Sequence, residues 1–122
     1  MKLTNKEVKD LYEKTLDLVK TKPPEFFNLR KMNNSVGLCY WTDIELDYRR
    51  DIIPTAFHEL LHYLYPDWPE SDIKYAESRI INVCSSFEVA EFLKHLADKI
   101  YKREVQKLIP ETAPKSKKRK KK

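Results

Sequence analysis

Long apolar runs are absent from this chain of 122 residues. A membrane-spanning helix needs about 20 consecutive apolar residues, so the sequence predicts no such helix. The first residues, Met1 to Lys6, also lack the apolar core of a secretory signal peptide. We therefore expect a soluble protein of the cytoplasm.

Cysteine is scarce, and the two cysteines, Cys39 and Cys84, lie far apart in the sequence and outside any paired metal-ligand motif. A disulfide between them is one alternative. The simpler interpretation is two small buried side chains in a reducing compartment. This interpretation agrees with a cytoplasmic location.

The net charge of +5 is not spread evenly along the chain. Residues 115–122 hold seven of the 24 basic side chains, and the remaining 17 basic residues face 19 acidic ones. Without this segment the net charge is −2, so the basicity belongs to the C-terminal end. A chain of this length fits one domain. We predict one domain over residues 1–110 and a disordered basic tail over residues 111–122.

The first half of the chain predicts one helix and three strands. Thr4 and Glu7 have the spacing of a capping box, and apolar residues recur at helical spacing to about Lys20. Residues 26–32 and 36–41 are predicted as a hairpin that turns at Asn33-Asn34. Residues 44–48 alternate apolar with acidic side chains, as expected for a third strand. The only glycine, Gly37, indicates a bulge or a close backbone approach.

The second half predicts three helices separated by breaks. Prolines after His62 end the first of these helices, and a second capping box at Ser85 and Glu88 separates the other two. The predicted helices run from about Asp51 past His62, from about Pro69 to Cys84, and from Ser85 to about Leu108. Together with the strands they give an α+β fold.

The segment His58-Glu59-Leu60-Leu61-His62 is the strongest functional signal. Residues four positions apart lie on one helical face, so the two imidazoles can converge on one metal ion. Glu59 lies to the side of that line, where a carboxylate can act on a water molecule without binding the metal. The alternative is an amphipathic core helix with two surface histidines. We expect a Zn²⁺ site in which Glu59 is catalytic.

A catalytic zinc needs a third protein ligand, and no further histidine follows at short spacing. Glu77 falls within the buried stripe of the next predicted helix, where binding a cation would remove the cost of burying a carboxylate. Glu70 has the same helical phase, although an interaction with the helix dipole explains it equally well. Asp67 fits a helix cap. The sequence favours His58, His62 and Glu77 as metal ligands, with Glu70 as the alternative.

The motif followed by a glutamate on the next helix resembles the gluzincin branch of zincin metallopeptidases. The order of elements is similar to that of the minigluzincins, and the segment from Tyr65 to Glu70 resembles small phage-encoded proteins with the same histidine motif. The resemblance implies a minimal zincin-like domain that binds Zn²⁺ through His58, His62 and the downstream glutamate, Glu77. It also implies that Glu59 is the general base and acid in peptide hydrolysis.

Two classes of function remain open. The first is a zinc endopeptidase with a peptide or protein substrate, which would extend along residues 36–41 or 44–48. The second is a non-peptidase metal-containing module. The basic tail, Lys115 to Lys122, is a solvated end, a nucleic-acid contact or a segment that fills the protein's own cleft. Candidates for stabilising a transition state are, by chemistry alone, Tyr48, Tyr63, Tyr75 and His95.

Overall fold

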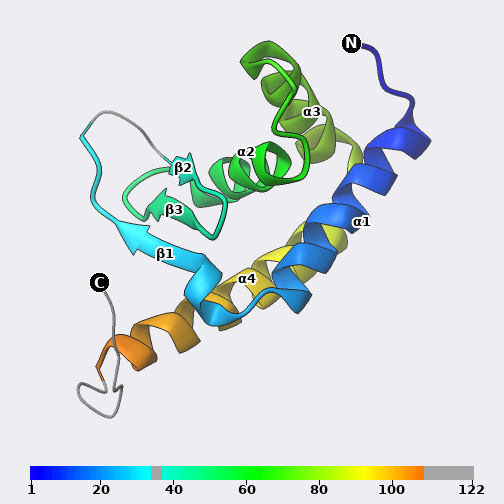
Figure 1. The fold of residues 1–122 in the computed structure, drawn as a ribbon. Helices are drawn as coiled ribbons and strands as arrows, with labels where there is room; N and C mark the ends of the chain where they lie inside the picture. Colours follow the sequence, from blue (N-terminus) through cyan, green and yellow to red (C-terminus); the bar gives the residue numbers. More distant parts are fainter. Residues whose placement is uncertain (34–36, 109–122) are drawn as a thin grey trace.

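The computed structural model describes residues 1–33 and 37–108 and confirms the α+β fold (Figure 1). The predicted tail lies outside these residues, and so does Asn34 of the predicted hairpin turn. Among the described residues, no helix is both long and apolar enough to cross a membrane. In chain order the elements are α1 (Asn5–Thr21), the 3₁₀ helix η1 (Pro24–Phe26), β1 (Phe27–Arg30), β2 (Gly37–Cys39), β3 (Ile44–Asp47), α2 (Ile52–Leu64), α3 (Glu70–Val83) and α4 (Ser86–Lys107).

Both predicted capping boxes are present. The Thr4 side chain accepts a hydrogen bond from the Glu7 backbone N–H at 3.1 Å, and the Glu7 carboxylate accepts one from the Thr4 N–H at 2.8 Å. Ser85 and Glu88 repeat the arrangement at 3.1 and 2.8 Å. Each box satisfies N–H groups that the start of a helix leaves without partners. The break before Ser85 is therefore built into the sequence, and α3 and α4 are separate helices.

The sheet has the order β1-β3-β2, which differs from the predicted hairpin between residues 26–32 and 36–41. β1 pairs with β3 in parallel, and β2 pairs with β3 antiparallel. β3 therefore lies between the other two strands, and its Ile44 and Leu46 side chains are fully buried. The tight turn lies instead between β2 and β3, where the Tyr40 N–H donates to the Asp43 carbonyl at 2.7 Å.

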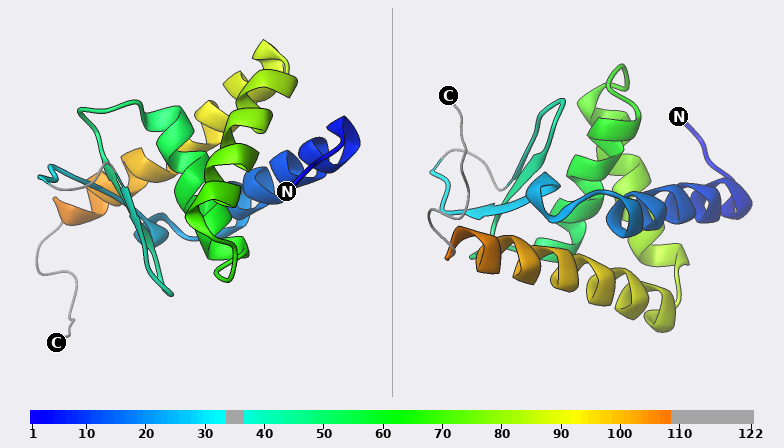
Figure 2. Two further views of the ribbon diagram at one scale, coloured as in Figure 1. Left: turned by 90° about the horizontal axis from the view of Figure 1, so that it is seen from above. Right: turned by 60° about the horizontal axis from the view of Figure 1, so that its bottom comes forward.

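Helix α2 is the central element of the domain. It packs against β2 and β3 on one side and against α3 and α1 on the other (Figures 1 and 2). Its Phe57 ring stacks on Phe92 of α4, with ring centroids 4.0 Å apart, and also contacts Tyr12 of α1. Full burial of each such side chain contributes about 1.5–3 kcal/mol. The helix that carries the histidine motif is therefore held from three directions.

The end of β3 is fixed by the buried carboxylate of Asp47. It accepts hydrogen bonds from the Met32 N–H at 3.0 Å, from the Arg49 N–H at 3.0 Å and from the Arg49 guanidinium at 2.8 Å. Arg49 also donates to the Met32 carbonyl at 2.8 Å. These bonds, with the side-chain bonds from Arg49 foremost, hold the pKa of Asp47 well below its usual range. The network fixes the chain just before α2 begins.

Candidate metal centre

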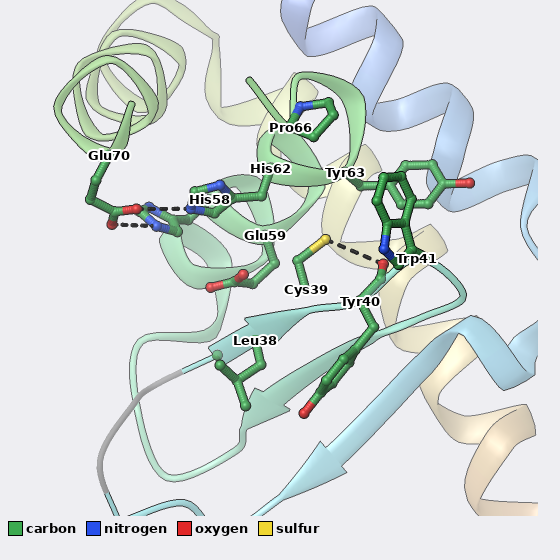
Figure 3. Close-up of a pocket in the computed structure, with 11 residues that line it drawn as sticks. Leu38, Cys39, Tyr40, Trp41, His58, Glu59, His62, Tyr63, Pro66 and Glu70 are labelled. Atoms are coloured by element: carbon green, nitrogen blue, oxygen red, sulfur yellow. Dashed lines mark hydrogen bonds and ion pairs between the residues drawn. The ribbon is translucent and has the colours of Figure 1, made fainter. Parts of the chain in front are cut away.

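The apolar side of α2 is buried and leaves both motif histidines on the opposite side. Phe57, Leu60 and Leu61 are fully buried in the core. His58 and His62 lie one helical turn apart, with ring centroids 4.8 Å apart, and border a pocket (Figure 3). The predicted placement of two imidazoles on one face is therefore confirmed.

The third side chain at this point is Glu70, from the first turn of α3. Its Oε2 lies 2.8 Å from Nε2 of His58, and its Oε1 lies 2.9 Å from Nε2 of His62 (Figure 3). One donor atom from each of the three residues lies within 4.8 Å of the other two. Two imidazole nitrogens and one carboxylate oxygen form the ligand set of catalytic zinc sites such as His₂Glu. The residues present therefore fit a zinc ion in both chemistry and spacing.

The turn between α2 and α3 explains how Glu70 reaches the histidines. The Tyr65 and Trp68 rings stack with centroids 4.2 Å apart, and the Trp68 N–H donates to the Tyr65 carbonyl at 3.1 Å. Pro69 then caps α3, two residues later than Asp67, which the sequence suggested as a cap. This tight return brings the first turn of α3 back beside the last turn of α2.

Glu77, the third ligand favoured by the sequence, occupies a different position. Its Oε1 lies 2.8 Å from Nδ1 of His58, on the side of the imidazole that faces away from Glu70. Seven residues at a rise of about 1.5 Å separate Glu70 and Glu77 by roughly 10 Å along the helix, so the two carboxylates cannot meet at one point. The structure thus places the alternative, Glu70, at the point of convergence and places Glu77 behind His58.

The hydrogen bond that the Glu77 carboxylate accepts from His58 raises the pKa of His58, against the effect of partial burial, and the other nearby carboxylates add to the rise. Two further acidic residues, one on α3 and one on α4, lie elsewhere. Asp72 is 4.0 Å from the amino group of Met1, and Glu88 binds Lys9 at 2.8 Å. Neither is part of the donor cluster.

Glu59 lies beside the cluster with only 5% of its surface exposed. Its carboxylate lines the same pocket as the two histidines. No group in the described part of the chain donates a hydrogen bond to this carboxylate. Burial raises the pKa of Glu59 to about 7, His58 opposes the rise, and the negative charges of Glu70 and Glu77 add to it. A carboxylate with free acceptor atoms and this pKa is suited to take up a proton near neutral pH.

The only glycine of the chain is explained by this buried carboxylate. A Cβ atom at Gly37 would lie 2.7 Å from Cγ2 of Thr55 and 3.0 Å from both Cγ and Oε2 of Glu59. The β2 backbone therefore passes directly over α2 at the catalytic candidate. Of the two predicted reasons for Gly37, the close backbone approach is confirmed.

The pocket in front of the cluster has a volume of about 800 Å³ and combines two kinds of lining. His58, His62, Glu59 and Glu70 form the polar end, and residues of β2, the following turn and the end of α2 form the rest. Figure 3 shows the Leu38 and Tyr40 side chains on the other side of the strand from Cys39, pointing away from the histidines. Leu38, Cys39, Tyr40 and Trp41 belong to the segment 36–41 that the sequence suggested for an extended substrate, although no single one of them was predicted to line a pocket. Tyr63 was named from the sequence by its chemistry alone, and Pro66 was missed as a pocket residue.

Among the residues considered for transition-state stabilisation, only Tyr63 lines this pocket. Its hydroxyl group accepts a hydrogen bond from Lys22 at 2.6 Å. Tyr75 instead binds Arg79 and the Leu3 N–H, Tyr48 is exposed, and His95 is half-buried on α4. The geometry of the pocket thus assigns no transition-state role to Tyr48, Tyr75 or His95.

The geometry of this cluster is the basis for any functional interpretation. No protein-family model, no curated protein and no solved structure matches the chain.

Proposed function

We propose that the protein is a zinc-dependent metallopeptidase of the gluzincin type, with His58, His62 and Glu70 as metal ligands and Glu59 as the catalytic acid and base. The observation that carries this proposal is the convergence of the three donor residues within 4.8 Å, next to a buried carboxylate that lines the same pocket. A purely structural metal site would have no use for such a carboxylate. The proposal replaces Glu77 by Glu70 as the third ligand.

A zinc ion at this site would supply Lewis acidity, which polarises a carbonyl group and lowers the pKa of a water molecule towards about 7. Glu59 accepts a proton as the water oxygen forms a bond to the peptide carbonyl carbon. The same carboxyl group then donates this proton to the departing amine nitrogen as the C–N bond breaks. The proton is returned within each cycle, and Glu59 ends as a carboxylate.

Glu77 acts in this proposal as a positioning residue. A hydrogen bond at Nδ1 fixes the orientation and tautomer of an imidazole that binds a metal through Nε2. The 2.8 Å contact with His58 has this arrangement. This hydrogen bond also makes Nε2 of the ring a stronger electron donor to a metal ion.

The sheet order restricts where an extended substrate can lie. β3 has strands on both sides, so its backbone cannot pair with another strand. β2 is an edge strand, and its residues Gly37, Leu38 and Cys39 line the pocket. Of the two segments considered from the sequence, residues 36–41 contain β2. We therefore propose that the substrate backbone pairs with β2 as an added strand.

The test is cleavage of a pool of synthetic peptides by the purified protein and by Glu59→Gln, with metal content measured in parallel. We expect one zinc per chain in both proteins and a loss of at least about 100-fold in cleavage rate in the variant. Glu13→Gln, an exposed substitution on α1, is the matched control and should keep full activity. Retained cleavage by Glu59→Gln would contradict the proposal.

The same experiment separates the alternative function. A protein that binds zinc stoichiometrically but cleaves no peptide of the pool would be a metal-containing binding module. A protein that binds no zinc would rule out both interpretations.

A further inference from the structure

The pocket in front of Glu59 has a second half with no charged side chain among the described residues. It is formed by β2, by the turn after it and by the end of α2. Figure 3 shows Trp41 on the side of the pocket away from Glu70. The lining residues of this uncharged half are Leu38, Cys39, Tyr40, Trp41, Tyr63 and Pro66.

Trp41 is the most unusual residue of this half. It is 88% exposed, although an indole ring is among the most favourable groups to bury. The other tryptophan, Trp68, stacks on Tyr65, whereas no ring of the described residues stacks on Trp41. A large apolar surface exposed at the rim of a pocket indicates a binding site.

Tyr63 forms a fixed part of the same wall. Its hydroxyl group is held by Lys22 at 2.6 Å, and its ring packs edge-to-face on Phe26 with centroids 5.1 Å apart. The hydroxyl group is therefore engaged by a lysine that does not line the pocket. The Tyr63 ring is therefore already held in place beside the pocket, whereas the Trp41 ring is exposed to solvent.

Both halves belong to one continuous pocket of about 800 Å³, which is within the range of small-ligand sites. A peptide bond placed at the polar half would have a neighbouring side chain within reach of the uncharged half. An apolar or aromatic side chain would cover Trp41, whereas a charged one would find no partner of opposite charge there.

We propose that Trp41, together with Tyr63, binds a bulky apolar or aromatic side chain next to the cleaved bond and so restricts the substrates to peptides that carry one. This inference rests on the proposed peptidase function and names its substrate class. Trp41 is a specificity-determining residue in this proposal. Removal of its ring should weaken discrimination between substrates and leave the chemistry at Glu59 unchanged.

The test compares peptides that are identical except for one residue beside the cleavage site, which is Phe, Leu, Ala, Asp or Lys. We expect kcat/KM to be at least about tenfold higher for Phe and Leu than for the other three. Trp41→Ala should reduce this preference about fivefold or more, through a higher KM for the Phe and Leu peptides. Equal cleavage of all five peptides, or an unchanged preference in Trp41→Ala, would overturn the inference.

Tyr101→Ala is the matched control, because Tyr101 is 70% exposed but lies on α4 and does not line the pocket. Its substrate preference should equal that of wild type. A loss of preference as large as that in Trp41→Ala would also count against the inference, because the effect would then not depend on the pocket.

A binding measurement keeps the inference testable if no peptide is cleaved, an outcome that would contradict the proposed function alone. Trp68→Phe leaves Trp41 as the only tryptophan, so its fluorescence reports on the pocket. N-acetyl-phenylalaninamide should change this fluorescence saturably and with at least fivefold higher affinity than N-acetyl-alaninamide. A response without saturation, or equal affinities for the two compounds, would refute binding of an apolar side chain at Trp41.

Discussion

Glu77 and His58 form a hydrogen bond of 2.8 Å at Nδ1, and Glu70 contacts Nε2 of the same ring, also at 2.8 Å. One imidazole of α2 is therefore held between two carboxylates of α3. The two carboxylates have different surroundings, because Glu70 lies at the pocket and Glu77 does not line it. In the proposed function, this difference separates the metal ligand Glu70 from Glu77, which orients a ligand.

Removal of Glu70 should abolish stoichiometric zinc binding, because the two remaining histidines hold a metal only weakly. Zinc at about 100 times its dissociation constant should raise the free energy of unfolding of wild type by about 2.7 kcal/mol. In Glu70→Ala this increase should disappear. Thermal melts with and without zinc measure both values. Asp72→Ala, in the same helical turn, is the control and should respond to zinc as wild type does.

Glu77→Gln should keep the metal but bind it roughly 10–100-fold more weakly, because the amide orients His58 less strongly than the carboxylate. Competition with a chromogenic chelator measures the affinity. If Glu77→Ala lost zinc and Glu70→Ala kept it, with both variants folded, the assignment of the two glutamates would be reversed.

Gly37→Ala should lower the free energy of unfolding by about 1–3 kcal/mol, because the new Cβ would overlap the Thr55 methyl group and the Glu59 side chain. It should also reduce peptidase activity by displacing Glu59, and zinc content should not change. Urea denaturation and a metal assay give the two readouts.

The double variant Gly37→Ala, Thr55→Ser separates the loss of stability from the loss of peptidase activity. Serine lacks the methyl group at 2.7 Å but keeps the hydroxyl group that donates to the Asp51 carbonyl at 2.7 Å. Stability should recover in part. Activity should remain low, since the contacts at 3.0 Å with Glu59 persist. Full recovery of activity would show that Glu59 is not displaced by the added methyl group.

Asp47→Asn should make stability less dependent on pH in the acid range. The folded-state pKa of Asp47 is lowered by its bonds with Arg49 and with the Arg49 and Met32 amides. The stabilisation is therefore present above the unfolded pKa of about 3.9 and is lost as pH falls through the folded pKa. Wild type should exceed the variant in urea midpoint at pH 7, and the difference should shrink below about pH 4. A constant difference between pH 7 and pH 2.5 would contradict this role.

Local features of the fold could be predicted from the sequence because short-range contacts determine them. Two capping boxes each join residues three positions apart, Thr4 with Glu7 and Ser85 with Glu88, and the structure contains both. The placement of His58 and His62 on one helical face follows equally from helical geometry.

Long-range features were less accessible. The pairing of β1 with β3 joins residues 17 positions apart, such as Phe27 and Ile44, and periodicity shows which face of a strand is buried but not which strands are neighbours. Glu70 and Glu77 share a helical phase, so only the turn at Pro69 decides which one meets the histidines. The part played by Trp41 depends on the fold of the turn after β2, which brings an apparently ordinary strand residue to the pocket.

The contacts at the candidate centre differ in their separation along the chain. His58, His62 and Glu70 span 13 residues of two consecutive helices, whereas the burial of Glu59 depends on Gly37, from a strand 22 positions earlier. Closing the shorter loop costs less chain entropy, and local contacts generally form sooner during folding. We therefore expect a helical hairpin of α2 and α3 to be able to capture zinc before the sheet docks. Glu59 would lose its hydration shell only after docking, so a partly folded chain would carry zinc without hydrolytic competence.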